Sequence, residues 1–124
     1  MEWSPISKPR GSLAREPNLA SYDEARHAFT WPMARAMLGG LPGGGLNIAH
    51  EAVFRHLAGP AAGRVAIRFL AQGQAPVEKT YQELAQDARR FANVLARLGV
   101  QHGERVASLM GRVPALYATV LGAL

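Results

Sequence analysis

Two histidines and a glutamate are the side chains of this sequence whose types and spacing could bind a metal ion or move a proton. They are His50, Glu51 and His56, in a segment that Asn47 can open as the N-cap of a helix from 48 to about 57. Zinc proteases place two histidines four residues apart on one helix face, with a glutamate beside the first. Here the separation is six, so the two rings diverge around the helix. The pattern favours partly exposed histidines over a metal site.

A glycine-rich stretch is the second feature with the composition of a ligand-binding loop. It reads Gly39-Gly40-Leu41-Pro42-Gly43-Gly44-Gly45. A phosphate-binding loop would need a Lys-Ser/Thr pair, and a dinucleotide loop would need a preceding strand and a different glycine spacing. Both requirements are unmet, so we expect a flexible connector here.

Charge and composition exclude several classes of function. The net charge is +5, but the 14 lysines and arginines are spread along the chain and only Arg89 and Arg90 are adjacent. No basic run is interleaved with aromatic residues, which favours a solvated surface over a nucleic-acid site. The chain has no cysteine, and its first residues lack the basic and then apolar segments of a secretion signal. No stretch approaches the roughly 18 apolar residues that span a bilayer. We expect a cytoplasmic protein that binds neither nucleic acid nor membrane.

The elements that position everything else lie between Val65 and Gly99. Residues 65–70 are apolar and partly β-branched, which predicts a strand, and 77–79 predict a short return strand after a turn. Thr80 and Glu83 then form a capping box that opens a long helix, and Gly99 supplies its left-handed C-terminal cap. One face of this helix is apolar, at Leu84, Ala88, Phe91, Leu95 and Leu98.

The residues before this hairpin and helix divide into two parts. Residues 1–20 contain three prolines and a glycine, and they predict an extended arm. Residues 21–60 predict a helical extension, which begins with a capping box at Ser21 and a helix to about Phe29. A second helix restarts at Thr30 and runs to Leu38, with Pro32 in its first turn.

The residues after the long helix predict a strand and another helix. Residues 105–110 read as a buried strand, which would complete a right-handed β-α-β crossover. Residues 113–124 carry no charge, so a helix formed there would need covering on all sides. Together with an uncapped end at Leu124, this predicts that a larger α/β protein continues beyond the sequence and that the chain alone tends to self-associate.

From Leu46 onward the chain resembles the N-terminal region of AMP-forming acetyl-CoA synthetases, members of the adenylate-forming superfamily. The resemblance is strongest in Thr80-Tyr81-Gln82-Glu83-Leu84 and in Gly103-Glu104-Arg105-Val106-Ala107. The other segments that carry it are Leu46–Ala52, Arg55-His56, Val65–Ile67, Arg90–Leu95, Leu98–Val100 and Met110–Tyr117, with Tyr22 and Phe29–Trp31 upstream.

This resemblance implies a two-step ligase. A carboxylate and ATP give an acyl-adenylate and pyrophosphate, and the thiol of CoA then displaces AMP. It implies ATP, CoA and Mg²⁺ as cofactors of the full-length enzyme and a small carboxylic acid as its substrate. It also implies an α/β fold in which residues 61–124 begin the AMP-binding large domain, with the remainder of that domain as their partner.

No catalytic, cofactor-binding or metal-binding residue is carried over onto this chain. The Ser/Thr/Gly-rich phosphate loop is missing, and the lysines are Lys8, in the arm, and Lys79, just before a helix cap. In the family these sites come after the point where this sequence ends. We therefore expect the 124 residues alone to be inactive and to hold no cofactor.

Two alternatives stay open. Phe54, Gly111 and Ala115 depart from residues that are frequent in the family, so the acid could be propionate or a longer one. A free-standing basic binding module is the alternative from another class. Strong weakening of a nucleic-acid complex by salt would identify such a module.

Overall fold

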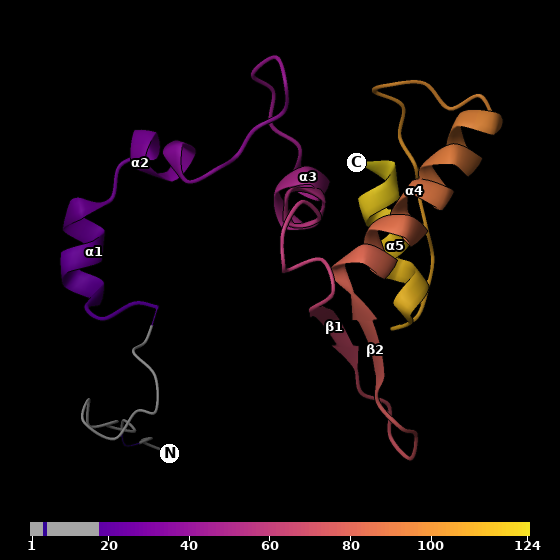
Figure 1. Ribbon diagram of the computed structural model, residues 1–124, viewed down its shortest axis with the longest axis horizontal. Coiled ribbons are helices and arrows are strands. Elements are labelled where there is room, and N and C mark those ends of the chain that lie inside the picture. The colour runs from indigo at the N-terminus through magenta and orange to yellow at the C-terminus, as the bar shows by residue number, and fades with distance from the viewer. Residues whose placement is uncertain (1–3, 5–17) are drawn as a thin grey trace. The chain divides into compact units, whose positions relative to one another are not determined.

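The computed structural model describes residue 4 and residues 18–124 (Figure 1). The chain divides into two compact units between Met37 and Leu38. The arm expected over residues 1–20 lies outside the described residues, apart from residue 4 and residues 18–20.

The described part of the first unit contains two short helices, α1 (Tyr22–Ala28) and α2 (Trp31–Ala36). Ser21 caps α1 by accepting the amide of Glu24, and Thr30 caps α2 by accepting the amide of Met33. The rings of Phe29 and Trp31 meet edge to face with centroids 5.3 Å apart. The predicted first helix is confirmed, whereas the second ends two residues before Leu38, because Met37 serves as its C-cap.

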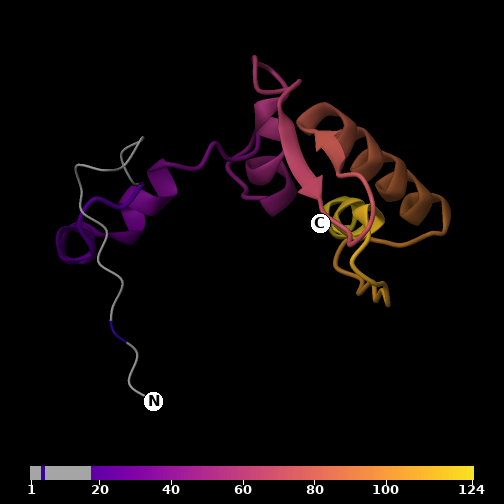
Figure 2. The same ribbon diagram turned by 90° about the horizontal axis from the view of Figure 1, so that it is seen from below.

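The second unit contains an antiparallel hairpin, β1 (Val65–Phe69) and β2 (Val77–Thr80), as expected. The two strands lie side by side in Figures 1 and 2. Arg68 and Glu78 face each other in the register, and their side chains form an ion pair of 2.6 Å. A register shift between Val65 and Ile67 marks a bulge at the start of β1.

The long helix α4 (Tyr81–Arg97) begins directly after β2. Both halves of the predicted capping box are present. The hydroxyl oxygen of Thr80 accepts the Glu83 amide at 3.2 Å, and the Glu83 carboxylate accepts the Thr80 amide at 2.8 Å. At the other end Gly99 has a φ of +83°, and the amide of Val100 bonds back to the carbonyl of Leu95. This is the left-handed helix end that the glycine predicted.

The single helix expected from 48 to about 57 is wrong. The structure has α3 (Ile48–Ala52) and then one 3-10 turn, η2 (Phe54–His56). Val53 leaves the helical region at φ −131° and ψ −59°. Its side chain is buried with Leu84 and Ala85, so core packing accounts for the break.

The last helix, α5 (Pro114–Ala123), packs along α4, and the two lie together in Figures 1 and 2. Thr119 of α5 is buried, whereas Tyr117 and Val120 of the same helix are about half exposed. The described residues therefore cover only part of this helix, and the rest of the covering that its apolar sequence calls for does not come from them.

The strand expected at residues 105–110 is wrong. Residues 104–110 form no helix or strand, and the described sheet has two strands only. A strand needs a ladder of hydrogen bonds with a neighbour, and neither β1 nor β2 pairs with this segment. Its apolar side chains stay exposed, Leu109 completely. The mixed helix-and-strand class holds, but the β-α-β crossover is absent from the described part of the chain.

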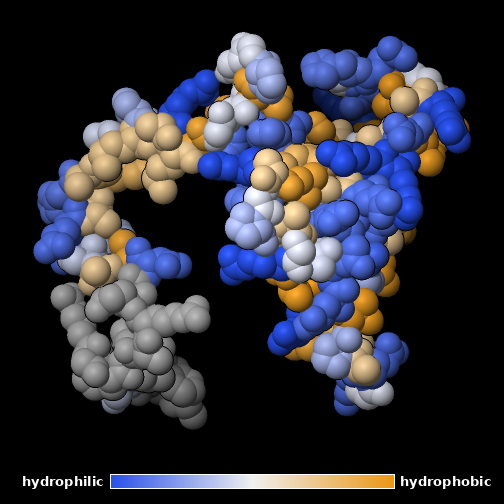
Figure 3. All heavy atoms as spheres, viewed as in Figure 1, coloured by the Kyte–Doolittle hydropathy of each residue, from blue (hydrophilic) through white to orange (hydrophobic). Residues whose placement is uncertain are grey.

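The core of the second unit is small. Val53, Leu84 and Ala85 are buried, and Phe54, Leu57, Ala66, Ile67, Tyr81 and Leu121 pack around them. Many large apolar side chains reach the surface, and Figure 3 shows several of them beside the hairpin. Among the residues that the structure describes, no helix combines the length and apolar character needed to cross a lipid bilayer.

Candidate functional site

The carboxylate of Glu51 accepts three hydrogen bonds near the start of the second unit. One carboxylate oxygen (Oε2) accepts the amide of Gly39 at 2.9 Å and the guanidinium of Arg55 at 2.6 Å. The other oxygen (Oε1) accepts the amide of Gly40 at 2.6 Å. We call these four groups, Glu51, Arg55 and the amides of Gly39 and Gly40, the Glu51 clasp.

Local sequence explains why the Glu51 clasp forms. Glu51 lies on α3 and Arg55 on η2, four residues later, so the two side chains reach the same side. Gly40 has a φ of +71°, a conformation that favours glycine, and it turns the loop so that two successive amides face one carboxylate. The loop closes with the amide of Leu41 bonded to the carbonyl of Gly45 at 2.8 Å.

These contacts stabilise the ionised form of the glutamate. The amide of Gly39 contributes most to holding the pKa of Glu51 below its ordinary value, and the amide of Gly40 and Arg55 lower it further. Partial desolvation acts in the opposite direction and is outweighed. Glu51 is therefore a fixed anion at neutral pH, which suits a structural contact better than proton transfer.

The glycine-rich loop, expected as a flexible connector, is thus hydrogen-bonded to the Glu51 side chain at its first two residues. Sequence reasoning noted Glu51 only as a member of a failed zinc motif. The available signal was a Glu-x-x-x-Arg pair that follows two adjacent glycines. Since the Gly39 and Gly40 amides already bind a carboxylate, they do not present a cradle to a phosphate group.

The two histidines have separate surroundings. The backbone amide of His50 completes the N-cap of α3 by donating to Asn47 at 2.8 Å. The ring of His56 lies against the ring of Tyr81, with centroids 5.1 Å apart. Within residue 4 and residues 18–124, no three ligating side chains come together in a way that could hold a metal ion.

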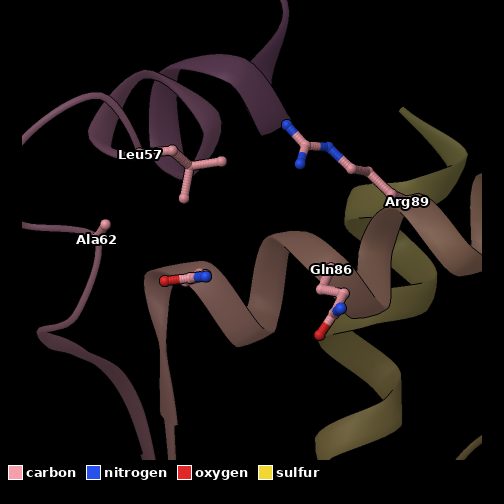
Figure 4. Close-up of a pocket in the computed structure, with 5 residues that line it drawn as sticks. Leu57, Ala62, Gln86 and Arg89 are labelled. Carbon is pink, nitrogen blue, oxygen red and sulfur yellow. The ribbon is translucent and has the colours of Figure 1, made fainter.

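An open pocket of about 380 Å³ lies between the start of α4 and the chain after η2 (Figure 4). Gln82, Gln86 and Arg89 line it from α4, and Leu57 and Ala62 line the opposite side. The guanidinium of Arg89 stacks over the ring of Phe54 at 5.2 Å, which fixes its direction. The lining offers hydrogen-bond donors but no nucleophile and no carboxylate, so the pocket could bind a polar group without transforming it.

Comparison with known proteins identifies the chain more directly than these sites do. The model of the AMP-binding enzyme family matches residues 54–124. An acetyl-coenzyme A synthetase of Bacillus subtilis is 34% identical over 108 residues, which is 86% of this chain and 19% of the relative. A 3-hydroxypropionyl-coenzyme A synthetase of Metallosphaera sedula is 34% identical over 90 residues, or 73% of this chain and 13% of the relative.

A solved structure agrees with these relatives. The crystal structure of a Brucella canis acyl-CoA synthetase superimposes with a TM-score of 0.71 and 37% identity, over 82% of this chain and 18% of that one. The chain thus spans less than a fifth of the length of each of these three proteins. The family match covers more than half of the 124 residues, including the hairpin, α4 and α5, and on that basis the chain belongs to the family of AMP-binding enzymes.

Proposed function

We propose that this chain is part of an AMP-forming acyl-CoA ligase whose substrate is a small carboxylic acid, with acetate as the first candidate. The observation that carries the proposal is the similarity to an acetyl-coenzyme A synthetase over 86% of the chain. The similar 3-hydroxypropionyl-coenzyme A synthetase supports the second candidate, another short acid. The reaction would join the acid to CoA through an acyl-adenylate, with ATP and Mg²⁺ as cofactors.

The described residues would contribute a scaffold to this reaction. The Glu51 clasp binds an internal carboxylate, and the pocket beside Arg89 contains no reacting group. Neither the clasp nor the pocket fits a triphosphate with its metal ion. The loop amides already bind Glu51, and the described residues bring no three metal-ligating side chains together. The nucleotide and CoA sites therefore belong to residues outside this chain in our proposal.

The domain division proposed here follows the same reasoning. Residues 21–60 would form a helical extension, and residues 61–124 the beginning of the large AMP-binding domain. Half-exposed apolar side chains of α5, such as Tyr117 and Val120, support this assignment because a larger domain would cover them. The two-stranded hairpin supports it as well, since one edge of each strand lacks a described neighbour.

The longer protein that carries this chain should be tested with a panel of acids. Acetate, propionate, 3-hydroxypropionate and a medium-chain acid are each incubated with ATP, Mg²⁺ and CoA, and the acyl-CoA products are identified by mass spectrometry. We expect AMP and acetyl-CoA to appear together. A preference for propionate or 3-hydroxypropionate would select the second candidate, and failure with every acid would refute the ligase proposal.

The 124 residues alone provide a separate test of where the reactive groups lie. We expect no acetate-dependent exchange between ATP and pyrophosphate from the purified chain. Exchange above the level of a heat-treated sample would show that the described residues contain a complete adenylation site, contrary to the proposal.

A further inference from the structure

The donors of the Glu51 clasp come from parts of the chain that are separated in sequence. Two amides come from residues 39 and 40, and the guanidinium comes from Arg55, which lies 16 and 15 residues further on, respectively. All three bonds measure between 2.6 and 2.9 Å. Two successive backbone amides and a guanidinium on one carboxylate form the arrangement that proteins use to bind anions.

The surroundings of the clasp indicate more than an exposed ion pair. The side chain of Glu51 is only 14% exposed, against 36% for Arg55. A Cβ built on Gly39 would lie 3.6 Å from the Arg55 guanidinium, so the loop backbone packs directly on that group. Backbone donors lose less conformational entropy than a second long side chain would, which makes such a contact more favourable than most surface pairs.

We propose that the amides of Gly39 and Gly40 and the guanidinium of Arg55 form a carboxylate receptor, occupied by Glu51 of the same chain, that fastens the glycine loop onto α3. The receptor acts at the first residues of the second compact unit, directly after the division between Met37 and Leu38.

An open apolar pocket beside the loop depends on the same contact. Leu38 and Leu46, at the two ends of the loop, line this pocket of about 370 Å³ together with Ile48 and Ala52 of α3, and Glu51 also borders it. Releasing the amides would free the end that carries Leu38. The clasp thus shapes the pocket as well as the loop.

Amide hydrogen exchange followed by NMR tests the fastening directly. We expect Glu51→Ala to accelerate exchange at Gly39 and Gly40 by about tenfold or more, because bonds to a charged acceptor are lost. Glu104→Gln is the matched control, since the Glu104 carboxylate accepts the Gln101 amide within a local turn. Amides of Leu84 and Ala85 in α4 report whether each variant remains folded.

The outcome at α4 decides which variant is used. If Glu51→Ala also accelerates exchange at Leu84 and Ala85, Glu51→Gln replaces it, because that change removes the charge and keeps the shape. Accelerated exchange at Gly39 and Gly40 in a folded variant supports the fastening. Unchanged exchange at both glycines in a folded variant overturns it.

Chemical rescue tests the receptor itself. Sodium formate added to Glu51→Ala should restore the protection of Gly39 and Gly40, whereas sodium chloride at equal ionic strength should not. The double variant Glu51→Ala, Arg55→Gln should respond more weakly to formate. Equal effects of formate and chloride would contradict specific carboxylate binding by these donors, even if Glu51 itself does fasten the loop.

Discussion

At Gly122 the backbone of α5 lies directly against α4. A Cβ built there would collide with the carbonyl oxygen of Ala88 and would lie 3.1 Å from the Cβ of Phe91. Because Ala88 is fully buried, neither helix can move aside without disturbing the core. Glycine at this position is therefore a packing requirement rather than a sign of flexibility.

We predict that Gly122→Ala destabilises the protein. Overpacking of this kind costs about 1–3 kcal/mol, which outweighs the gain in helix propensity of about 1 kcal/mol. Urea unfolding followed by circular dichroism measures the difference. Gly111→Ala is the control, because its Cβ would meet nothing within 4 Å. Equal midpoints for the two variants would show that α5 does not pack on α4 as described.

The two glutamates with lowered pKa values predict how stability depends on pH. The amide and then the hydroxyl of Thr80 lower the pKa of Glu83, as the amide of Gly39 does for Glu51. Since the unfolded chain binds these protons at higher pH, the folded state is favoured by both carboxylates above roughly pH 4.3, their unperturbed pKa. This contribution is lost as the pH falls through the lowered pKa values.

We therefore expect the urea midpoint to fall between about pH 5 and about pH 3. Glu83→Gln should lower the midpoint at neutral pH and make the decline with acid shallower. Glu78→Gln, at an exposed cross-strand pair, is the comparison variant. A steeper decline in Glu83→Gln than in the parent protein would contradict the assignment.

At the scale of elements, the capping box of α4 provides the sharpest prediction. Thr80→Ala should reduce the free energy of unfolding by about 0.5–2 kcal/mol, the usual cost of a lost N-cap. Thr80→Ser, which keeps the hydroxyl oxygen that accepts the Glu83 amide, should retain most of the stability. Thermal unfolding of the three proteins provides the measurement. Similar losses for alanine and serine would indicate a packing role for the threonine methyl group instead.

Elements whose ends are marked by local chemistry could be predicted from the sequence. Ser21, Asn47 and Thr80 all cap the helices they were expected to cap, because each bonds to an amide three residues away. Thr30, expected only to begin the second helix, caps it in the same way. Residues 105–110 show the opposite case. Their apolar pattern is compatible with a strand, but a strand requires a partner, and no local pattern reports whether one exists.

The Glu51 clasp could not be predicted for the same reason. Each amide of Gly39 and Gly40 is a donor that every loop possesses, so its partner depends on how the loop returns to α3. The break at Val53 also depends on the core, since the buried contacts with Leu84 and Ala85 cross about 30 residues of sequence. The sequence did carry the family resemblance, which the match over residues 54–124 confirms.

At the scale of the whole molecule, exposed apolar surface predicts association. Tyr117 and Val120 on α5 and Val65 and Val77 on the hairpin are each more than 40% exposed. We expect the 124-residue chain to self-associate with rising concentration, and Val120→Lys to weaken this association by placing a charge on α5. Sedimentation velocity provides the measurement.

The control places the same charge elsewhere. Gln86→Lys adds a lysine to the exposed polar side of α4 and should leave the association unchanged. A monodisperse monomer at every concentration, or equal effects of the two lysines, would contradict an interface on α5.

The position of Thr80 has a consequence for how this region tolerates change in length. Thr80 is both the last residue of β2 and the N-cap of α4, so no loop separates strand from helix. An inserted residue between them would rotate every following side chain by about 100° around the helix axis. Leu84 and Ala88 would then turn away from their neighbours. Insertions and deletions should therefore accumulate at the Gly73 turn and after Gly99, while the junction at Thr80 keeps a constant length.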